Sequence, residues 1–171
     1  MNRIQQIQYL IQVLLQEMPA YQEQARAFPQ DELSQWRLLR SLMNVRPPMP
    51  LDPSFLAVQD ALLSAEREEK GVVEADALPE RPGHPGIALW QGDITRLKAD
   101  AIVDADNDRL LGCFVPCHSC IDNAIHSAAG LQLRDECSRL MEQQGRPEPT
   151  GQAKLTGGYN LPARYVLHTV G

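Results

Sequence analysis

The residues best suited to chemistry lie between positions 113 and 120, where three of the chain's four cysteines occur together with one of its four histidines. Cys113, His118 and Cys120 form the pattern C-x4-H-x-C, which places two thiols and an imidazole in one loop. Cysteine sulfur and histidine nitrogen are the usual donors to zinc, and three protein ligands leave a fourth position open, as in catalytic zinc sites. The pattern therefore predicts a Zn²⁺ site with an open position.

Cys117 leaves a second interpretation of this loop. As a fourth ligand it would close the zinc site and make it structural. We expect the open version, because the neighbouring side chains of Cys117 and His118 diverge and reach one ion only through a special turn. A third interpretation is a chance cluster of cysteines that binds no metal.

Asp122 stands at the start of a helix predicted over residues 120–129. In one interpretation its carboxylate satisfies the free amides of the first helical turn and interacts with the helix dipole. In the other, the helix N-terminus receives an anionic group such as a pyrophosphate while Asp122 polarises a water molecule. We expect His126 and His168 to be structural histidines with satisfied ring nitrogens, and Cys137 to be a packed residue.

The elements that must position these residues divide the chain into two parts. In the first part apolar residues recur at helical spacing, and Asp52 and Pro53 are suited to begin a helix. Helices are predicted over residues 3–18, about 30–44 and 52–70. Residues 1–71 are therefore expected to form a small helical unit that packs on the main domain. Residues 72–86, rich in proline, glycine and acidic residues, are expected to be a linker.

Residues 87–171 change to alternating strands and helices, which is typical of an α/β domain with a sheet buried between helices. Strands are predicted over residues 87–91, 101–104, 153–161 and 165–170, and helices over 120–129 and 131–144. The chain ends at Gly171, directly after what is predicted to be an interior strand. We therefore expect a truncated domain that lacks the loop at the carboxyl end of that strand, where ligands bind in such folds.

Composition excludes several classes of function. The net charge is -6 and the sequence has no cluster of Lys and Arg, so we expect no binding to nucleic acid. No apolar run reaches the ~20 residues of a membrane span, and the N-terminus lacks the uninterrupted apolar core of a signal peptide, so we expect no membrane association and a cytoplasmic location. The cytoplasm is reducing, so we expect the clustered cysteines to be metal ligands or reactive thiols and not to form disulfides.

The segment WQGDITRLKADAIVDADNDRLLGCFVPCHSCIDNAIHSAAGLQLRDEC resembles the first half of a macrodomain, the ADP-ribose-binding α/β/α module. It is most similar to the zinc-containing bacterial macrodomains that act as protein-ADP-ribose hydrolases. The motifs GDIT, LLGCF and H-x-C-I-D-N-A-I-H occur in order, and the resemblance runs from about Ile87 to Gly171. The helical N-terminal segment is also similar to the extension that those bacterial proteins carry. The resemblance implies a three-layer α/β/α sheet, incomplete at its C-terminal end.

The resemblance also implies roles for individual residues. Asp93 would accept a hydrogen bond from the adenine amino group, and the backbone N–H of Ile94 would lie nearby. Asn107 would bind the distal ribose, and Asp122 would orient or activate the attacking water, which makes these two the expected catalytic residues. The zinc would lie beside that ribose, held by the three ligands named above. Phosphate and ribose oxygens would meet the backbone around Cys120, Ile121 and Asp122.

The implied activity is hydrolysis of the bond that joins mono-ADP-ribose to a modified protein, with Zn²⁺ as the cofactor. Two alternatives stay open: an ADP-ribose reader without turnover, or an inactive truncated macrodomain. A structural zinc protein without a nucleotide site is a further hypothesis. The family usually reads N-A-A-N where this chain has Asp104, Ala105, Asp106 and Asn107. A carboxylate at Asp104 would disfavour an anionic ligand if it faced the pocket.

Overall fold

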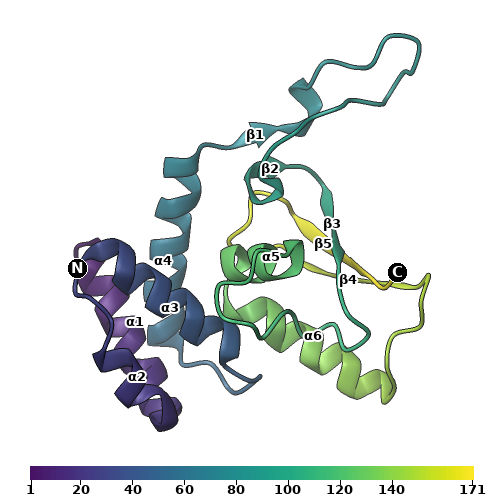
Figure 1. The fold of residues 1–171 in the computed structure, drawn as a ribbon. Helices are drawn as coiled ribbons and strands as arrows, with labels where there is room; N and C mark the ends of the chain where they lie inside the picture. The colour runs from purple at the N-terminus through teal and green to yellow at the C-terminus, as the bar shows by residue number, and fades with distance from the viewer.

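A computed structural model describes residues 1–171 as a group of helices followed by an α/β part (Figure 1). None of the helices combines the length and the apolar character that crossing a membrane requires. The elements are α1 (Arg3–Glu17), η1 (Pro19–Tyr21), α2 (Gln22–Arg26), α3 (Glu32–Val45), α4 (Pro53–Lys70), β1 (Val73–Glu74), η2 (Ala75–Ala77), η3 (Ile94–Arg96), β2 (Leu97–Lys98), β3 (Ala101–Ala105), α5 (Ile121–Ala129), α6 (Leu131–Gln144), β4 (Ala153–Gly157) and β5 (Tyr165–Thr169).

The three predicted N-terminal helices are present as α1, α3 and α4, each within two residues of its predicted ends. Helix α1 begins with a capping box in which Asn2 and Gln5 satisfy each other's backbone amides. Helix α4 begins at the cap Asp52, which accepts hydrogen bonds from two backbone amides, and ends at Gly71, whose φ is 77°. The apolar stripes of the three helices share one core, formed mainly by Ile7, Leu10, Leu14, Leu38, Leu39, Leu42, Phe55, Leu62 and Leu63.

The α/β part is built on a three-stranded sheet in the order β3-β5-β4, with β3 parallel and β4 antiparallel to β5. Along β3 the side chains of Ile102 and Asp104 are buried on one face, and that of Val103 between them points the other way. Helices α5 and α6 pack on the side of Ile102, where Ile125 and Leu133 complete a second core. On the opposite face Val103 is 51% exposed.

The strand predicted over residues 87–91 is wrong. Only Ala88 takes part in an isolated bridge, to Glu80, and the side chains of Ile87 and Leu89 are exposed. The segment projects from the body of the molecule, so it has no neighbouring strand to pair with its backbone and no core for its apolar side chains (Figure 1). A short apolar run alone therefore did not specify a strand here.

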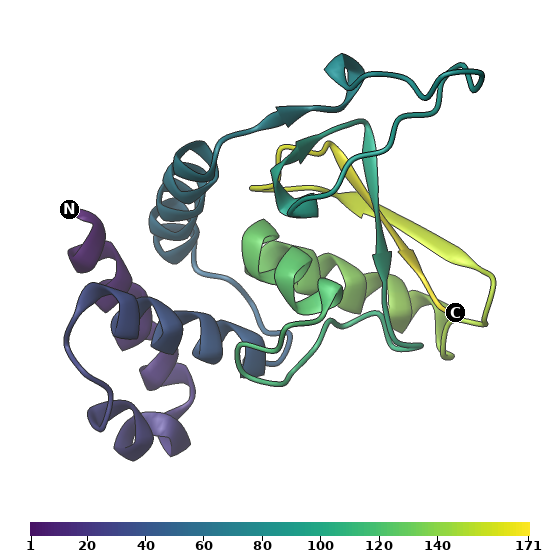
Figure 2. The same cartoon turned by 45° about the horizontal axis from the view of Figure 1, so that its top comes forward.

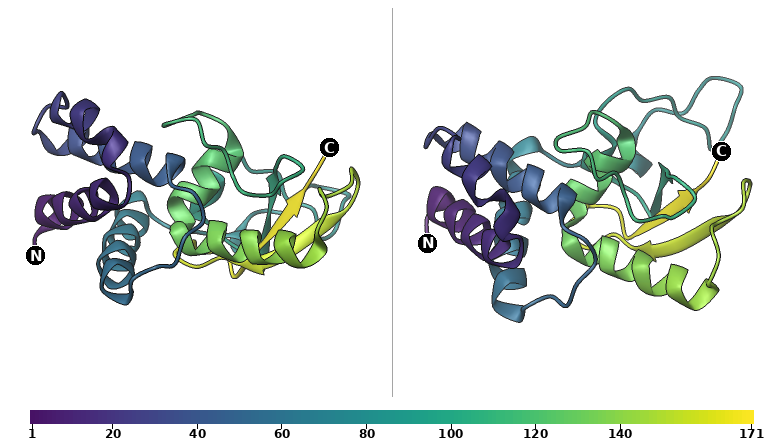
Figure 3. Two further views of the ribbon diagram at one scale, coloured as in Figure 1. Left: turned by 90° about the horizontal axis from the view of Figure 1, so that it is seen from below. Right: turned by 60° about the horizontal axis from the view of Figure 1, so that its bottom comes forward.

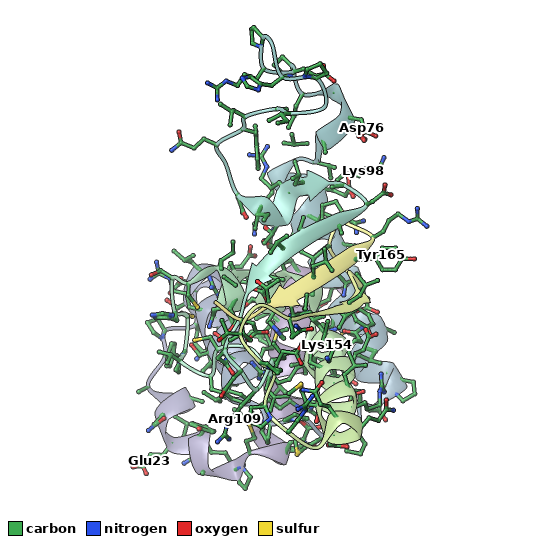
Figure 4. All side chains as sticks on the ribbon, turned by 90° about the vertical axis from the view of Figure 1, so that its right-hand side faces the viewer. Glu23, Asp76, Lys98, Arg109, Lys154 and Tyr165 are labelled. Atoms are coloured by element: carbon green, nitrogen blue, oxygen red, sulfur yellow. The ribbon has the colours of Figure 1, made fainter.

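The three-stranded sheet has two ends, and the candidate site residues follow the strand at one of them. Figure 4 shows the ends apart, with Tyr165 at the start of β5 and Arg109 beyond the end of β3. The projecting segment lies on the side of Asp76 and Lys98. The loop that carries Cys113 follows β3, so it leaves from the carboxyl ends of the two parallel strands, where α/β folds bind ligands.

Helix α5 lies between the N-terminal helices and the sheet, as Figures 2 and 3 show. The two parts are joined by the buried side chain of Arg134, on α6. Its Nη1 donates to the carbonyls of Met43, Asn44 and Arg46 at distances of 3.0, 2.8 and 2.7 Å, and its Nε donates to Leu111 O at 2.7 Å. The last carbonyls of a helix have no intrahelical partners, so Arg134 closes the C-terminal end of α3.

We expect Arg134→Met to lower the free energy of unfolding by about 3 kcal/mol, because it leaves several buried carbonyls without a donor. Urea denaturation followed by circular dichroism would measure the change. The matched control is Arg139→Met on the same helix, whose side chain is 61% exposed and pairs only with Asp135. That control should change stability by less than about 0.5 kcal/mol. Equal effects of the two substitutions would contradict the assigned role of Arg134.

Candidate functional site

The loop between β3 and α5 brings Cys113, His118 and Cys120 together. Their three donor atoms lie within 4.8 Å of one another, and the Cys113 Sγ to His118 Nδ1 distance is 3.7 Å. A tetrahedral zinc with bonds of about 2.3 Å to sulfur and about 2.0 Å to nitrogen holds neighbouring donors roughly 3.5–3.8 Å apart. The donor set and its spacing therefore fit a zinc ion with three protein ligands.

The start of α5 supports one of these sulfurs. Cys120 is the N-cap of the helix, and its Sγ accepts a hydrogen bond from the backbone N–H of Asn123 at 3.4 Å. Burial raises the pKa of the Cys120 thiol, so without a metal the thiol is protonated at neutral pH and metal binding must displace its proton. The amides of Ile121 and Asp122 precede the first intrahelical hydrogen bonds and are therefore suited to an anionic ligand.

Cys117 points away from the other two cysteines of the loop. Its backbone φ is 51°, in the left-handed region, yet this turn does not bring the Cys117 and His118 side chains together, and the two diverge as expected. The Cys117 Sγ lies 3.5 Å from Arg37 O and 3.4 Å from Ser41 Oγ, both on α3. The structure therefore does not bring Cys117 into the group of metal donors.

Helix α3 holds the loop between β3 and α5 in place, a contact that sequence reasoning missed. Asn44 Oδ1 accepts a hydrogen bond from the backbone N–H of Cys117 at 2.9 Å. Arg40 Nη2 donates to His118 O at 3.2 Å and to Asn123 Oδ1 at 2.7 Å. The N-terminal helices thus position the candidate ligands. Polar residues on a predicted surface helix carry no signal of such a contact, because their partners lie more than 70 positions away in the sequence.

Asp122 is buried in the first turn of α5 but does not cap the helix. Cys120 occupies the N-cap instead, and Asp122 Oδ1 has no hydrogen-bond partner. The expectation that Asp122 satisfies free amides of the first turn is therefore wrong, whereas its position in that turn, beside the positive end of the helix dipole, is as expected. Burial and the nearby carboxylates of Asp106 and Asp104 raise the pKa of Asp122 to about 8. A buried carboxyl group with a pKa near neutrality is suited to proton transfer.

A second group of ionisable side chains lies beneath α5. Asp104 and His168 are register partners on β3 and β5, and both are buried toward the helices. Burial disfavours the charged form of His168 and so lowers its pKa. The hydrogen-bonding carboxylates of Asp104 and Asp106 have the opposite and larger effect, and the pKa of His168 is raised to about 11. Burial also raises the pKa of Asp104. Asp104 therefore faces the inside of the domain instead of an open ligand pocket.

The two histidines near this group differ from each other. His168 has its expected partners, because its Nδ1 lies 3.2 Å from Asp106 Oδ2 and its Nε2 lies 2.9 Å from Thr156 Oγ1. The expectation of a satisfied His126 is wrong, since both of its ring nitrogens lack a hydrogen-bond partner. Burial holds the pKa of His126 well below its usual value. Cys137 is buried as expected.

The residues implied in nucleotide binding lie at separate places around α5. Asp93 caps η3, where its Oδ1 accepts from Thr95 N at 2.9 Å, and it lines a cavity of about 140 Å³ bounded by α3, α4 and α5. Ile94 follows it in η3. Asn107 is exposed in the turn after β3, and its Oδ1 accepts from Arg109 N at 3.0 Å.

Residues 103–171 match the Macro domain family. The chain is 50% identical over 165 residues to a protein-ADP-ribose hydrolase of Treponema medium, which covers 95% of this chain and 62% of that relative. It is 52% identical over 136 residues to a protein-ADP-ribose hydrolase of Staphylococcus aureus (strain MSSA476), covering 80% of this chain and 50% of the relative.

Among solved structures, the chain is similar to the Trypanosoma brucei macrodomain in complex with ADP-ribose, with a TM-score of 0.53 and 34% identity. That match covers 77% of this chain and 58% of the other. The chain thus spans 62% and 50% of the length of the two curated relatives.

Proposed function

Because the chain has a macrodomain fold preceded by a helical part, we propose that it is a zinc-dependent hydrolase that removes mono-ADP-ribose from modified proteins. The observation that carries the proposal is the position of the three candidate metal donors just before a helix whose second residue, Asp122, is buried with no hydrogen bond to its Oδ1. The relatives named protein-ADP-ribose hydrolase also support it.

In this proposal the reaction breaks the bond between the anomeric carbon of the distal ribose and the protein side chain. A water oxygen forms the new bond to that carbon, and the proton of the water passes to the carboxylate of Asp122. A proton is returned to the leaving side chain, so the products are ADP-ribose and unmodified protein. Asp122 is suited to hold and orient the water because its Oδ1 makes no hydrogen bond within the protein and the protein excludes bulk solvent from it.

Cys113, His118 and Cys120 would hold the zinc ion at the same end of α5. When bound, the zinc supplies an electrophile that stabilises negative charge on a ribose or water oxygen. The backbone amides of Ile121 and Asp122 would bind phosphate or ribose oxygens, because they lie at the positive end of the helix dipole.

Asn107 and Asp93 complete the proposed site at its two ends. The exposed turn after β3 makes the Asn107 side-chain amide available to the distal ribose. Asp93 Oδ1 is engaged by Thr95, but a carboxylate has further lone pairs that can accept from the adenine amino group, beside the backbone N–H of Ile94.

The test is a turnover assay with the whole chain carrying one zinc ion. The substrate is a protein mono-ADP-ribosylated with a labelled nucleotide, and chromatography measures free ADP-ribose over time. We expect release of many equivalents of ADP-ribose per chain. If the label stays on the protein while calorimetry detects binding of ADP-ribose, the chain is a reader and the hydrolase proposal fails. Absence of both binding and release would reject any role of this chain at ADP-ribose.

A further inference from the structure

We infer that the chain has a second divalent-cation site, beneath α5, formed by Asp104, Asp106, His126 and His168. It would take a first-row transition metal that accepts oxygen and nitrogen ligands, such as Mn²⁺. The site shares no ligand with the cysteine-containing one, and the inference does not depend on the proposed hydrolase activity.

The donor atoms converge from three elements. Asp104 on β3 and His168 on β5 are paired in register and point to the same side of the sheet, while His126 reaches them from α5. One ligand atom from each of these residues and Asp106 lies within 4.8 Å of the others. The Nδ1 of His168 lies 3.2 Å from Asp106 Oδ2 and 3.6 Å from Asp104 Oδ2.

This spacing is close to that of a metal site. Metal–ligand bonds of about 2.1 Å place neighbouring donors roughly 3.0 Å apart in octahedral and about 3.4 Å apart in tetrahedral coordination. The longest of the measured contacts, 4.0 Å between His126 Nε2 and Asp104 Oδ2, requires only a small inward movement of the imidazole. The four side chains are therefore nearly arranged as ligands.

Two of the four residues are buried without partners, which is the observation that points to a ligand. Both carboxylate oxygens of Asp104 lack a hydrogen bond, and the residue is 0% exposed. Both ring nitrogens of His126 also lack one, at 4% side-chain exposure. Burying polar groups without partners destabilises the folded protein, and the cost is larger for a charged group. A cation between them would satisfy the two side chains together.

The ring nitrogen of His168 that faces away from the proposed ion is already hydrogen-bonded, as is usual for a metal-bound histidine. This nitrogen, Nε2, lies 2.9 Å from Thr156 Oγ1, a hydroxyl that can accept a hydrogen bond from it. The Nδ1 of His168 lies against the carboxylates of Asp106 and Asp104, so a cation bound there would take the place of the Nδ1 proton while the other proton stays on Nε2. Histidine ligands in metal sites are held in this manner, with the second ring nitrogen donating to a protein group.

The local charge favours the same conclusion. Asp104, Asp106 and Asp122 place three carboxyl groups close together around buried ring nitrogens. The nearby cation Arg134 directs its guanidinium to the backbone carbonyls of α3 and Leu111. A divalent ion would offset the repulsion among these carboxylates at the point where they meet.

The experiment uses the whole chain loaded with one equivalent of Zn²⁺, so that the thiol-containing site is filled and leaves only oxygen and nitrogen donors for a harder ion. Mn²⁺ alone is then added, and the electron paramagnetic resonance signal of free Mn²⁺ measures its uptake. We expect one Mn²⁺ bound per chain, with hyperfine coupling to imidazole ¹⁴N. Absence of uptake, or bound Mn²⁺ without nitrogen coupling, would overturn the inference.

Variants locate the bound ion. Asp104→Asn and Asp106→Asn should each weaken Mn²⁺ binding by at least about 100-fold, since loss of a ligand costs at least as much as loss of an outer contact. The matched control is Asp100→Asn, whose side chain is 90% exposed, and it should bind Mn²⁺ as the natural chain does. If Asp104→Asn fails to fold, as judged by near-ultraviolet circular dichroism, Asp106→Asn decides. Unchanged affinity in the folded variants would overturn the site.

Discussion

Replacing Asp122 by asparagine is expected to lower kcat/KM for release of ADP-ribose from a modified protein by about 10³-fold, within the range known for loss of a general acid or base. Asparagine keeps the size of the side chain and can still contact a water molecule, but it cannot accept the proton of that water. Because Asp122 Oδ1 has no hydrogen-bond partner in the protein and lies 3.5 Å from His126 Nε2, the substitution breaks no internal hydrogen bond of that atom. The same turnover assay measures the effect.

Two further measurements separate this result from a loss of folding. The matched control is Asp108→Asn, an exposed acid in the turn after β3, which should retain activity within about threefold. ADP-ribose affinity measured by calorimetry should change much less than turnover in Asp122→Asn, because the backbone amides of the helix are unaltered. Activity of Asp122→Asn within threefold of the natural chain would remove Asp122 from the reaction.

The second large effect is expected from the metal ligands. The double substitution Cys113→Ser with Cys120→Ser should reduce bound zinc from one ion per chain to none detectable, and hydrolysis should fall by at least about 10³-fold. The physical reason is that a serine hydroxyl is a much weaker ligand for zinc than a thiolate. Elemental analysis of the dialysed chain measures the metal, and the turnover assay measures the activity.

Cys117→Ser is the matched control, since it removes a thiol from the same loop without touching the three donors. The Cys117 sulfur contacts Arg37 O and Ser41 Oγ on α3, so this variant should keep its zinc and most of its activity. Loss of zinc in Cys117→Ser to the same extent would indicate a closed site with four ligands. That result would favour a structural role of the metal over a catalytic one.

Much of the fold could be predicted from the sequence, because its signals are local. Residues such as Ile7, Leu10 and Leu14 recur at helical spacing and are buried in the structure. Asp52 and Gly71 mark the ends of α4 by the chemistry of helix caps. The apolar run at 87–91 misled the prediction, because a strand depends on a neighbour that the sequence does not identify.

The candidate site could be predicted only in part. The spacing of Cys113, His118 and Cys120 identified three donors that do converge. The direction of Cys117 and the anchoring of the loop by Arg40 depend on α3, far away in the sequence. The buried pair of Asp104 and His168 depends on the register of two strands, although a charged residue within each apolar strand pattern was a signal that could have been followed.

The measurement that tests the central claim most directly is X-ray absorption at the zinc edge of the chain carrying one zinc ion. A site formed by Cys113, His118 and Cys120 predicts two sulfur neighbours at about 2.3 Å, with one histidine nitrogen and one further light atom at about 2.0–2.1 Å. Addition of ADP-ribose should alter only the light-atom shell. Three or four sulfur neighbours, or a spectrum without sulfur, would contradict the open site on which the proposed hydrolysis depends.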